Sequence, residues 1–303
     1  MRITQSMLQN NMLRHLFKSQ QEMDKYFTQI YTGKKIRRPS EDPVIAMRGI
    51  GYRTELEEVK QYQRNVSNVW SWMDHADDAL DKATKVMQRL EELAIQAKND
   101  TLSQSERHSI LEEVKQLEQH LITIANTSVN GRYIFNGTDT NHAPVVYDES
   151  EGKGIIWEPA DPNVESGRDK PVIIEVSKGI TFEVNIDPDS VFPQELFDVI
   201  KDFKDALNGD PLKDIDDSIG ALQEMTQKII RGRADLGARM NRLELIEDRL
   251  SQQGIIAEDI MKKNEGVDFE EAVMNLLAQE AVHRAALASG AKLIQPSLID
   301  FLR

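Results

Sequence analysis

The chain has 303 residues, with 40% hydrophobic residues, 6% aromatic residues, a net charge of −14 and no cysteine. The lack of cysteine excludes disulfides, thiolate metal sites and cysteine nucleophiles, and the acidic balance disfavours nucleic acid as a partner. Long stretches rich in Leu, Ala, Glu, Lys and Gln favour helical bundles over a sheet-based enzyme. No stretch reaches the ~20 apolar residues of a membrane span, and the start lacks the apolar core of a cleavable signal peptide, so composition alone predicts a cytosolic protein.

The charge is unevenly distributed. Residues 141–210 contain 16 acidic and 6 basic side chains, whereas residues 1–50 contain 9 basic and 4 acidic ones. This asymmetry suits a solvated middle and an interfacial beginning.

The first segment, residues 1–32, is predicted to be an amphipathic helix. Its apolar positions recur at helical spacing and are Ile3, Met7, Met12, Leu16, Met23, Phe27 and Ile30. Because chain ends are usually polar and frayed, we expect this helix to be used in assembly.

A basic loop follows the first helix. Gly33, Arg37 and Pro39 lie in a stretch that prolines prevent from continuing as a helix. Its glycine lacks the spacing of a phosphate-binding loop, and its basic residues lack the aromatic neighbours typical of nucleic-acid sites. We therefore expect a solvated or subunit-facing loop, after which Asp42 caps a new helix that has Pro43 as its first residue.

That new helix is the strongest regular signal in the chain. From residue 59 to residue 97, apolar residues alternate in steps of three and four, which predicts a helix over 43–98. Ser103 and Glu106 have the spacing of a capping box, so a second helix, 103–128, is expected to pack back along the first. Aromatic and β-branched residues at 132–135, between two Asn-Gly pairs, predict a strand or hairpin.

Residues 141–193 change character, with six prolines and short apolar runs that predict a small β-rich insert. Helical spacing returns at 194–207 and again from residue 222 to residue 260. Gly232, Arg239 and Gln253 interrupt the apolar positions of this last stretch.

The final segment, residues 266–303, is predicted to be a helix capped by Asp268. Its apolar positions are Phe269, Val273, Leu276, Leu287, Ile294 and Leu298. Paired with residues 1–32, it could form a parallel or an antiparallel coiled coil. Glu280 and His283 lie on the same stripe, where they either fix the register as buried polar groups or face solvent after a small phase shift.

The sequence offers no catalytic, metal-binding or cofactor-binding residues. The six histidines lack zinc-ligand spacing, no nucleophile-elbow motif occurs, and the acids between residues 74 and 81 flank the apolar positions of a helix, where a hydrated face is expected. We therefore expect a protein that is not an enzyme.

These elements predict a mainly α fold. We expect an elongated antiparallel helical bundle, or coiled-coil rod, that the N- and C-terminal halves build together, with a small β-rich inserted domain. The predicted divisions are an assembly helix and loop at 1–42, the two halves of the helical rod at 43–140 and 194–265, the β-rich outer domain at 141–193, and a second assembly helix at 266–303.

Several strings resemble the bacterial flagellin superfamily. They are TGKKIRRPSEDP at 32–43, EELAIQA at 91–97 with NDT at 99–101, IAN at 124–126, NGRYIF at 130–135, GARMNRL at 237–243 and QPSLIDFL at 295–302. The PSEDP run is more similar to the hook-filament junction branch than to filament flagellins. The β-rich middle is unmatched.

The resemblance implies a structural adaptor of the bacterial flagellum that joins hook to filament by helical self-assembly, without catalysis or cofactors. It implies an extracellular position after type III export, which needs no cleavable signal. The implied partners are copies of itself, the first hook-associated protein, flagellin and an export chaperone, with no nucleic acid and no membrane span. A filament flagellin is the alternative, while a cytosolic helical enzyme would need a site that the sequence does not offer.

Overall fold

The structure is a computed structural model that describes residues 5–98, 103–149, 152–157, 167–209 and 214–294. The chain forms two compact units. Unit 1 consists of residues 1–58 and 253–303, and unit 2 consists of residues 59–252.

The fold is mainly α, as the sequence predicts. The helices are α1 (Gln5–Thr32), α2 (Pro43–Ala97), α3 (Gln104–Ala125), α4 (Pro188–Val191), α5 (Gln194–Leu207), α6 (Ile215–Glu265) and α7 (Phe269–Ile294). The predictions of helices over 43–98, 103–128 and 194–207 are confirmed to within three residues at each end. The five predicted divisions of the chain stay predictions.

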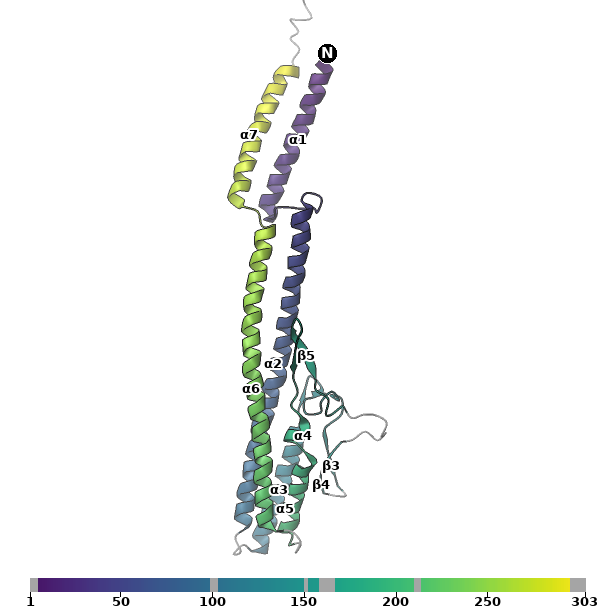
Figure 1. Cartoon of the computed structure of the whole chain (residues 1–303), viewed down its shortest axis with the longest axis vertical. Coiled ribbons are helices and arrows are strands. Elements are labelled where there is room, and N and C mark those ends of the chain that lie inside the picture. The colour runs from purple at the N-terminus through teal and green to yellow at the C-terminus, as the bar shows by residue number, and fades with distance from the viewer. Residues whose placement is uncertain (1–4, 99–102, 150–151, 158–166, 210–213, 295–303) are drawn as a thin grey trace, which may run out of the picture. The chain divides into compact units, whose positions relative to one another are not determined.

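The core of unit 2 lies between α2 and the antiparallel α6 (Figure 1). The three-four positions of α2 from Val59 to Ala97 are buried, except for the half-buried Tyr62. Trp70 donates its indole N–H to Glu247 at 2.7 Å, and Arg233 forms ion pairs with Asp77 and Asp81 at 2.8 and 2.6 Å. The hydrated face expected for the acids near residue 77 is therefore partly an interhelical contact.

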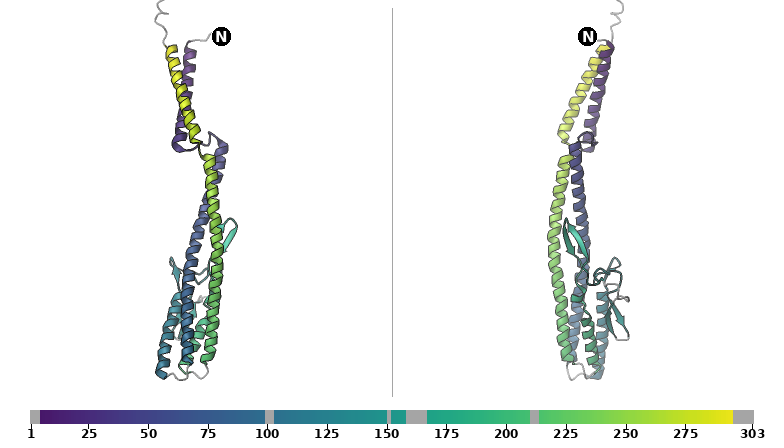
Figure 2. Two further views of the ribbon diagram at one scale, coloured as in Figure 1. Left: turned by 90° about the vertical axis from the view of Figure 1, so that its left-hand side faces the viewer. Right: turned by 45° about the vertical axis from the view of Figure 1, so that its right-hand side comes forward.

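Two further helices complete the bundle of unit 2. Helix α3 begins with the predicted capping box, in which Ser103 and Glu106 exchange hydrogen bonds, and Arg89 of α2 pairs with Glu113 of α3 at 2.8 Å. Helix α5 packs against α3, and the helices of this bundle lie side by side (Figure 2). An ion pair between Glu195 and Lys228 joins α5 to α6. Short connections thus produce antiparallel neighbours, as expected.

The strands of the described residues form three separate antiparallel hairpins. They are β1 (Ser128–Val129) with β2 (Arg132–Tyr133), β3 (Val145–Asp148) with β4 (Lys153–Ile156), and β5 (Ile173–Ser177) with β6 (Ile180–Glu183). The first turns through Asn130 and Gly131, both at positive φ, which is the backbone that a two-residue hairpin requires. The predicted hairpin and β-rich insert are confirmed.

The insert explains why the apolar spacing of α6 is interrupted. Gly232 is buried, and a Cβ added there would lie 2.6 Å from a methyl group of Val191 in α4. Arg239 reaches Glu183 at 3.6 Å and the carbonyl of Asn185 at 3.3 Å. Helix α6 therefore continues through Gly232 and Arg239. These two residues contact the β-rich segment and do not pack in the core against α2.

A buried ion pair joins α3 to α5. The ammonium group of Lys204 donates to Glu118 at 2.6 Å and to the carbonyl of Gly152 at 2.5 Å. Glu118 is 0% exposed and Lys204 is 6% exposed. Burial raises the pKa of Glu118, and the neighbouring ammonium group opposes that rise. The pair thus ties Gly152, just before β4, to the helical bundle.

Candidate assembly interface

The first and last helices of the described chain pair in antiparallel orientation in unit 1. Gln279 donates to the hydroxyl of Ser19 at 3.2 Å, and His283 contacts the same hydroxyl at 3.3 Å. One end of α7 meets the loop after α1, while at its other end Gly290 faces Met12 so closely that a Cβ there would overlap the methionine. The orientation that the sequence left open is therefore antiparallel.

The predicted assembly residues divide into two groups. The half-buried positions are Met12, Leu16, Met23, Ile30, Val273 and Leu276. Exposed positions are Met7, Phe27, Phe269 and Leu287, at 54%, 61%, 58% and 48%. Ile3, Leu298 and the side chain of Ile294 lie outside the described residues.

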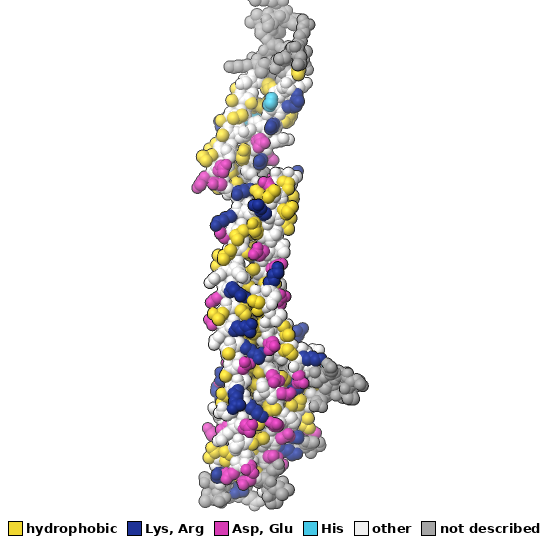
Figure 3. Space-filling model, in the orientation of Figure 1, with side chains coloured by type: hydrophobic (Ala, Val, Ile, Leu, Met, Phe, Trp, Pro, Cys, Tyr) yellow, Lys and Arg dark blue, Asp and Glu magenta, His cyan; other side chains and the backbone are white. Residues whose placement is uncertain are grey.

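Several exposed apolar residues in unit 1 lie off the predicted stripes. Phe17 and Tyr31 of α1 and Met274, Leu277 and Val282 of α7 are each more than half exposed. Figure 3 shows hydrophobic side chains along the surface of α7 and over the first turns of α2. Since each helix carries apolar residues on more than one face, a single partner helix cannot cover them all.

The two polar residues of the α7 stripe behave differently. His283 is half-buried and contacts Ser19, a residue only 7% exposed, so it faces the partner helix and not solvent; its role in fixing the register stays a prediction. Glu280 is also half-buried but pairs with Arg284 of its own helix at 3.4 Å. The register of the two helices is thus marked by one polar cluster around Ser19.

Backbone hydrogen bonds tie the basic loop to the connection between α6 and α7. Gly33 ends α1 at φ 68°, a conformation natural to glycine, and its N–H donates to the carbonyl of Gln29 at 2.8 Å. The N–H of Val267 donates to the Gly33 carbonyl at 3.0 Å, and Lys35 donates to the Glu265 carbonyl at 2.7 Å. The loop and the start of α7 are therefore held at one level of unit 1.

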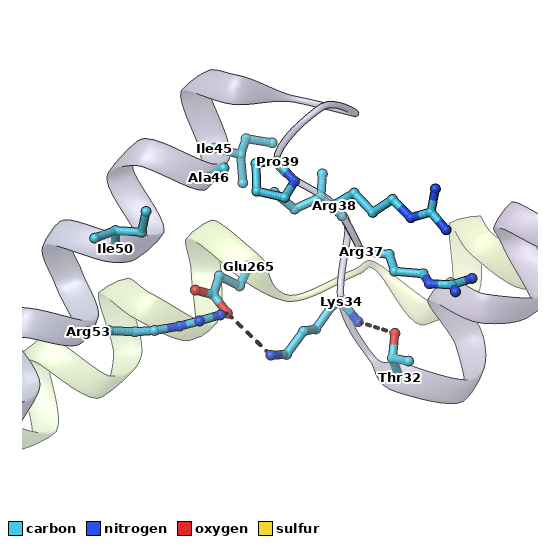
Figure 4. Close-up of a pocket in the computed structure, with 11 residues that line it drawn as sticks. Thr32, Lys34, Arg37, Arg38, Pro39, Ile45, Ala46, Ile50, Arg53 and Glu265 are labelled. Atoms are coloured by element: carbon cyan, nitrogen blue, oxygen red, sulfur yellow. Dashed lines mark hydrogen bonds and ion pairs between the residues drawn. The ribbon is translucent and has the colours of Figure 1, made fainter.

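Glu265, the last residue of α6, gathers the basic side chains of this region. Arg53 donates to its carboxylate at 2.5 Å and Lys34 lies 3.7 Å away (Figure 4). The hydrogen bond to Glu265 raises the pKa of Arg53. Sequence reasoning missed Glu265 because its partners lie more than 200 residues away in the chain.

Asp42 caps α2 as predicted, with Pro43 as the first helical residue. Its carboxylate accepts from the N–H groups of Val44 and Ile45 at 2.9 and 3.0 Å. We expect Asp42→Ala to cost about 1 kcal/mol locally, measured as faster hydrogen exchange in the first turn of α2. Exchange in α3 should be unchanged, and Ser40→Ala is the matched control; equal exchange in both variants would contradict the capping role.

The loop also walls a cavity of about 310 Å³ in unit 1. Arg37, Arg38 and Pro39 line it from the loop, and Ile45 and Ile50 line it from α2; Figure 4 shows Pro39 beside Ile45 and the two arginine side chains extending away from Ile50. In the described part of the chain, neither guanidinium group of the loop has a hydrogen-bond or ion-pair partner. The cavity thus combines an apolar part with charged side chains, of which Lys34 and Arg53 pair with Glu265 while Arg37 and Arg38 remain available.

Among the described residues, no three His, Asp or Glu side chains come together as metal ligands. None of the described helices combines the length and apolar character needed to cross a membrane. The exposed apolar residues of α1 and α7 suit contacts with protein.

Two family models match the chain at its two ends. The bacterial flagellin N-terminal helical region matches residues 3–140, and the flagellin C-terminal helical region matches residues 219–302. Together they include α1, α2, α3, α7 and most of α6. The chain belongs to the bacterial flagellin superfamily. The β-rich segment of this flagellin-family chain lies mostly between the two matched regions.

Relatives distinguish the branches of that superfamily. Flagellar hook-associated protein 3 of Escherichia coli is 27% identical over 300 residues, covering 93% of both chains. A flagellin of Clostridium tyrobutyricum is 28% identical over only 126 residues, covering 42% of this chain and 33% of its own. The chain is thus a hook-associated protein of the flagellum, since the match to hook-associated protein 3 spans nearly the full length of both chains, whereas the match to this flagellin is partial.

The fold agrees with that of solved structures. A flagellar hook-associated protein from Vibrio parahaemolyticus superimposes with a TM-score of 0.64 at 18% identity, covering 75% of this chain and all of that one. The predicted membership of the hook-filament junction branch is confirmed.

Proposed function

We propose that this chain is a structural adaptor at the junction between flagellar hook and filament. The observation that carries the proposal is the match to hook-associated protein 3 over almost the full length of both chains. The chain offers helices with uncovered apolar faces, which is what a subunit of a helical assembly requires.

The terminal segments are the proposed assembly interface. The exposed residues Met7, Phe27, Phe269 and Leu287 would be covered by neighbouring copies. The same role is proposed from the sequence for Ile3, Ile294 and Leu298. Burying apolar surface contributes ~25 cal/mol per Å², so a repeated contact can drive assembly without a bound cofactor. The half-buried residues of α1 and α7 would hold the two helices together, so that the exposed residues form one surface.

The finer predictions from the resemblance belong to the same proposal. We infer a purely structural protein without catalytic activity, exported without a cleavable signal, that contacts the first hook-associated protein on one side and flagellin on the other. A dedicated chaperone would shield its apolar helices before export.

The proposal is tested by locating the protein on detached flagella. Gold-labelled antibody should give a single band where the hook meets the filament in electron micrographs. Label along the whole filament would instead favour a filament flagellin, and flagella without label would overturn the proposal. Flagella from a strain that lacks the gene provide the antibody control.

A further inference from the structure

The basic loop of unit 1 offers two exposed cations beside an apolar cavity. Arg37 and Arg38 line the 310 Å³ cavity, and their side chains extend from the loop on the same side (Figure 4). Lys34 and Arg53 are already directed to Glu265. The two loop arginines therefore remain available to an anionic group from outside the chain.

The apolar part of the cavity adds a second requirement for a partner. Ile36, Pro39, Ile45 and Ile50 line it, and Ile50 is 64% exposed. An occupant that satisfies the whole surface needs a bulky apolar side chain next to negative charges, because a cation left against an apolar wall without an anion gains little.

The start of α7 carries that combination. Phe269 is 58% exposed and is followed by Glu270 and Glu271, both exposed acids in the first helical turn. Within the described residues, neither carboxylate forms an ion pair. An exposed aromatic residue followed by two available carboxylates meets both requirements: the ring matches the apolar part of the cavity, and the carboxylates match the two arginines.

Four acids of the β-rich segment and α5 are less suitable partners despite the negative charge of that region. Glu183, Asp189, Asp198 and Glu195 already form ion pairs with basic residues of their own chain. Breaking such pairs would offset part of the gain from a new contact.

Position in the fold also favours a second copy as the source. The backbone bridge between Lys34 and Gly266 holds the loop and the start of α7 at the same level of unit 1. Figure 1 shows α7 beginning on one side of that level and the loop before α2 on the other. A basic edge and an acidic edge on opposite sides of one body permit head-to-tail contacts between identical copies, which produce rings or helices.

We propose that the cavity beside Arg37 and Arg38 receives Phe269, Glu270 and Glu271 of a second copy of this chain. Phe269 enters the apolar part, and the two carboxylates pair with the two guanidinium groups. This contact rests on the proposed self-association at the junction, and it adds the residues and the direction of one interface.

Disulfide trapping tests the contact, because the natural chain has no cysteine. Cells lacking the natural gene would produce two full-length variants together, Arg38→Cys and Glu270→Cys, each with a different tag. Mild oxidation of isolated flagella should give a disulfide-linked dimer that carries both tags. As a matched control, Arg38→Cys would be combined with Gln119→Cys, an exposed position in unit 2, and should give no such dimer.

The outcomes separate this contact from the function itself. If both variants are found at the junction without a mixed dimer, the proposed contact is wrong while the adaptor function stands. If the natural chain and both variants are all absent from flagella, the adaptor function itself fails. Equal dimer yields with Gln119→Cys would likewise overturn the contact, since they would show unspecific trapping.

Charge reversal supplies an independent measurement. Arg37→Glu with Arg38→Glu should reduce the junction label at least severalfold, and so should Glu270→Arg with Glu271→Arg. Combining all four changes should restore label, since the charges are then exchanged across the contact. Failure of the combined variant to exceed either pair would contradict direct pairing.

Discussion

Lys204→Met is expected to destabilise unit 2 by about 3 kcal/mol at pH 7. The reason is that Lys204 faces Glu118 at 2.6 Å in a region where the carboxylate is 0% exposed. Removing the cation leaves a buried charge without its partner, and it also removes the donor to the Gly152 carbonyl. Urea unfolding of the purified chain, followed by circular dichroism, measures the loss.

The size of that loss should depend on pH in a defined direction. Burial raises the pKa of Glu118 above its ordinary value of 4.5, and Lys204 opposes the rise. A carboxyl whose folded pKa is raised favours folding below its unfolded pKa and loses that contribution as pH rises through the folded pKa. Without Lys204 the pKa rises further, so the difference from the natural chain should shrink as pH falls from 7 toward 4.5.

Two control variants isolate the buried pair. Replacing both partners, as in Glu118→Leu with Lys204→Met, should cost less than Lys204→Met alone, because no unpaired charge remains. Lys115→Met removes the cation of an exposed pair with Glu112 on the same helix and should change stability by less than about 1 kcal/mol. A double variant as unstable as the single one would show that packing, and not charge, dominates.

Regular spacing made the helical bundle predictable. Helix α2 keeps three-four steps over most of its length, and its observed bounds, Pro43–Ala97, nearly equal the predicted ones. The direction of the α1–α7 pair could not be predicted in this way, because an apolar stripe has the same period in either orientation. It is set by the loop hydrogen bonds around Gly33 and by the cluster around Ser19.

The buried ion pair shows a second limit on what sequence spacing can predict. Glu118 lies four residues after Val114 and three before Leu121, both fully buried, so its spacing does mark it as inward-facing. Its partner Lys204 belongs to α5, and no local pattern connects two helices separated by 86 residues. Spacing can therefore predict that Glu118 is buried, but it cannot predict that Lys204 is its partner.

The candidate interface divides in the same way. Helical spacing places Phe27 and Phe269 on apolar stripes, where their part in assembly stays a prediction, while the Asp42 cap was predicted from capping chemistry and is observed. The cavity beside the loop was not predictable, since it forms where α2 and the chain around Glu265 meet. Local rules identify which residues a helix presents, but tertiary contacts decide which of them together form a surface.

Phe27→Glu is expected to abolish assembly at the junction while leaving the free chain folded. Phe27 is 61% exposed on α1, so its replacement removes little packing from the single chain, and surface substitutions usually change stability by less than about 0.5 kcal/mol. In an assembly that covers this position, each copy would lose the roughly 1.5–3 kcal/mol that burying a large apolar side chain contributes. Each copy would also bury a new charge.

Ile95→Glu is the matched control for that variant. Ile95 is 57% exposed, also lies on a helix, and belongs to unit 2, outside the proposed interface. Both variants should unfold at the urea concentration of the natural chain, but only Phe27→Glu should lose the junction label and motility. If both variants assemble normally, α1 does not use this face; if both fail, loss of a surface apolar residue anywhere on the chain is enough to prevent export or assembly, and the terminal helices have no special part in it.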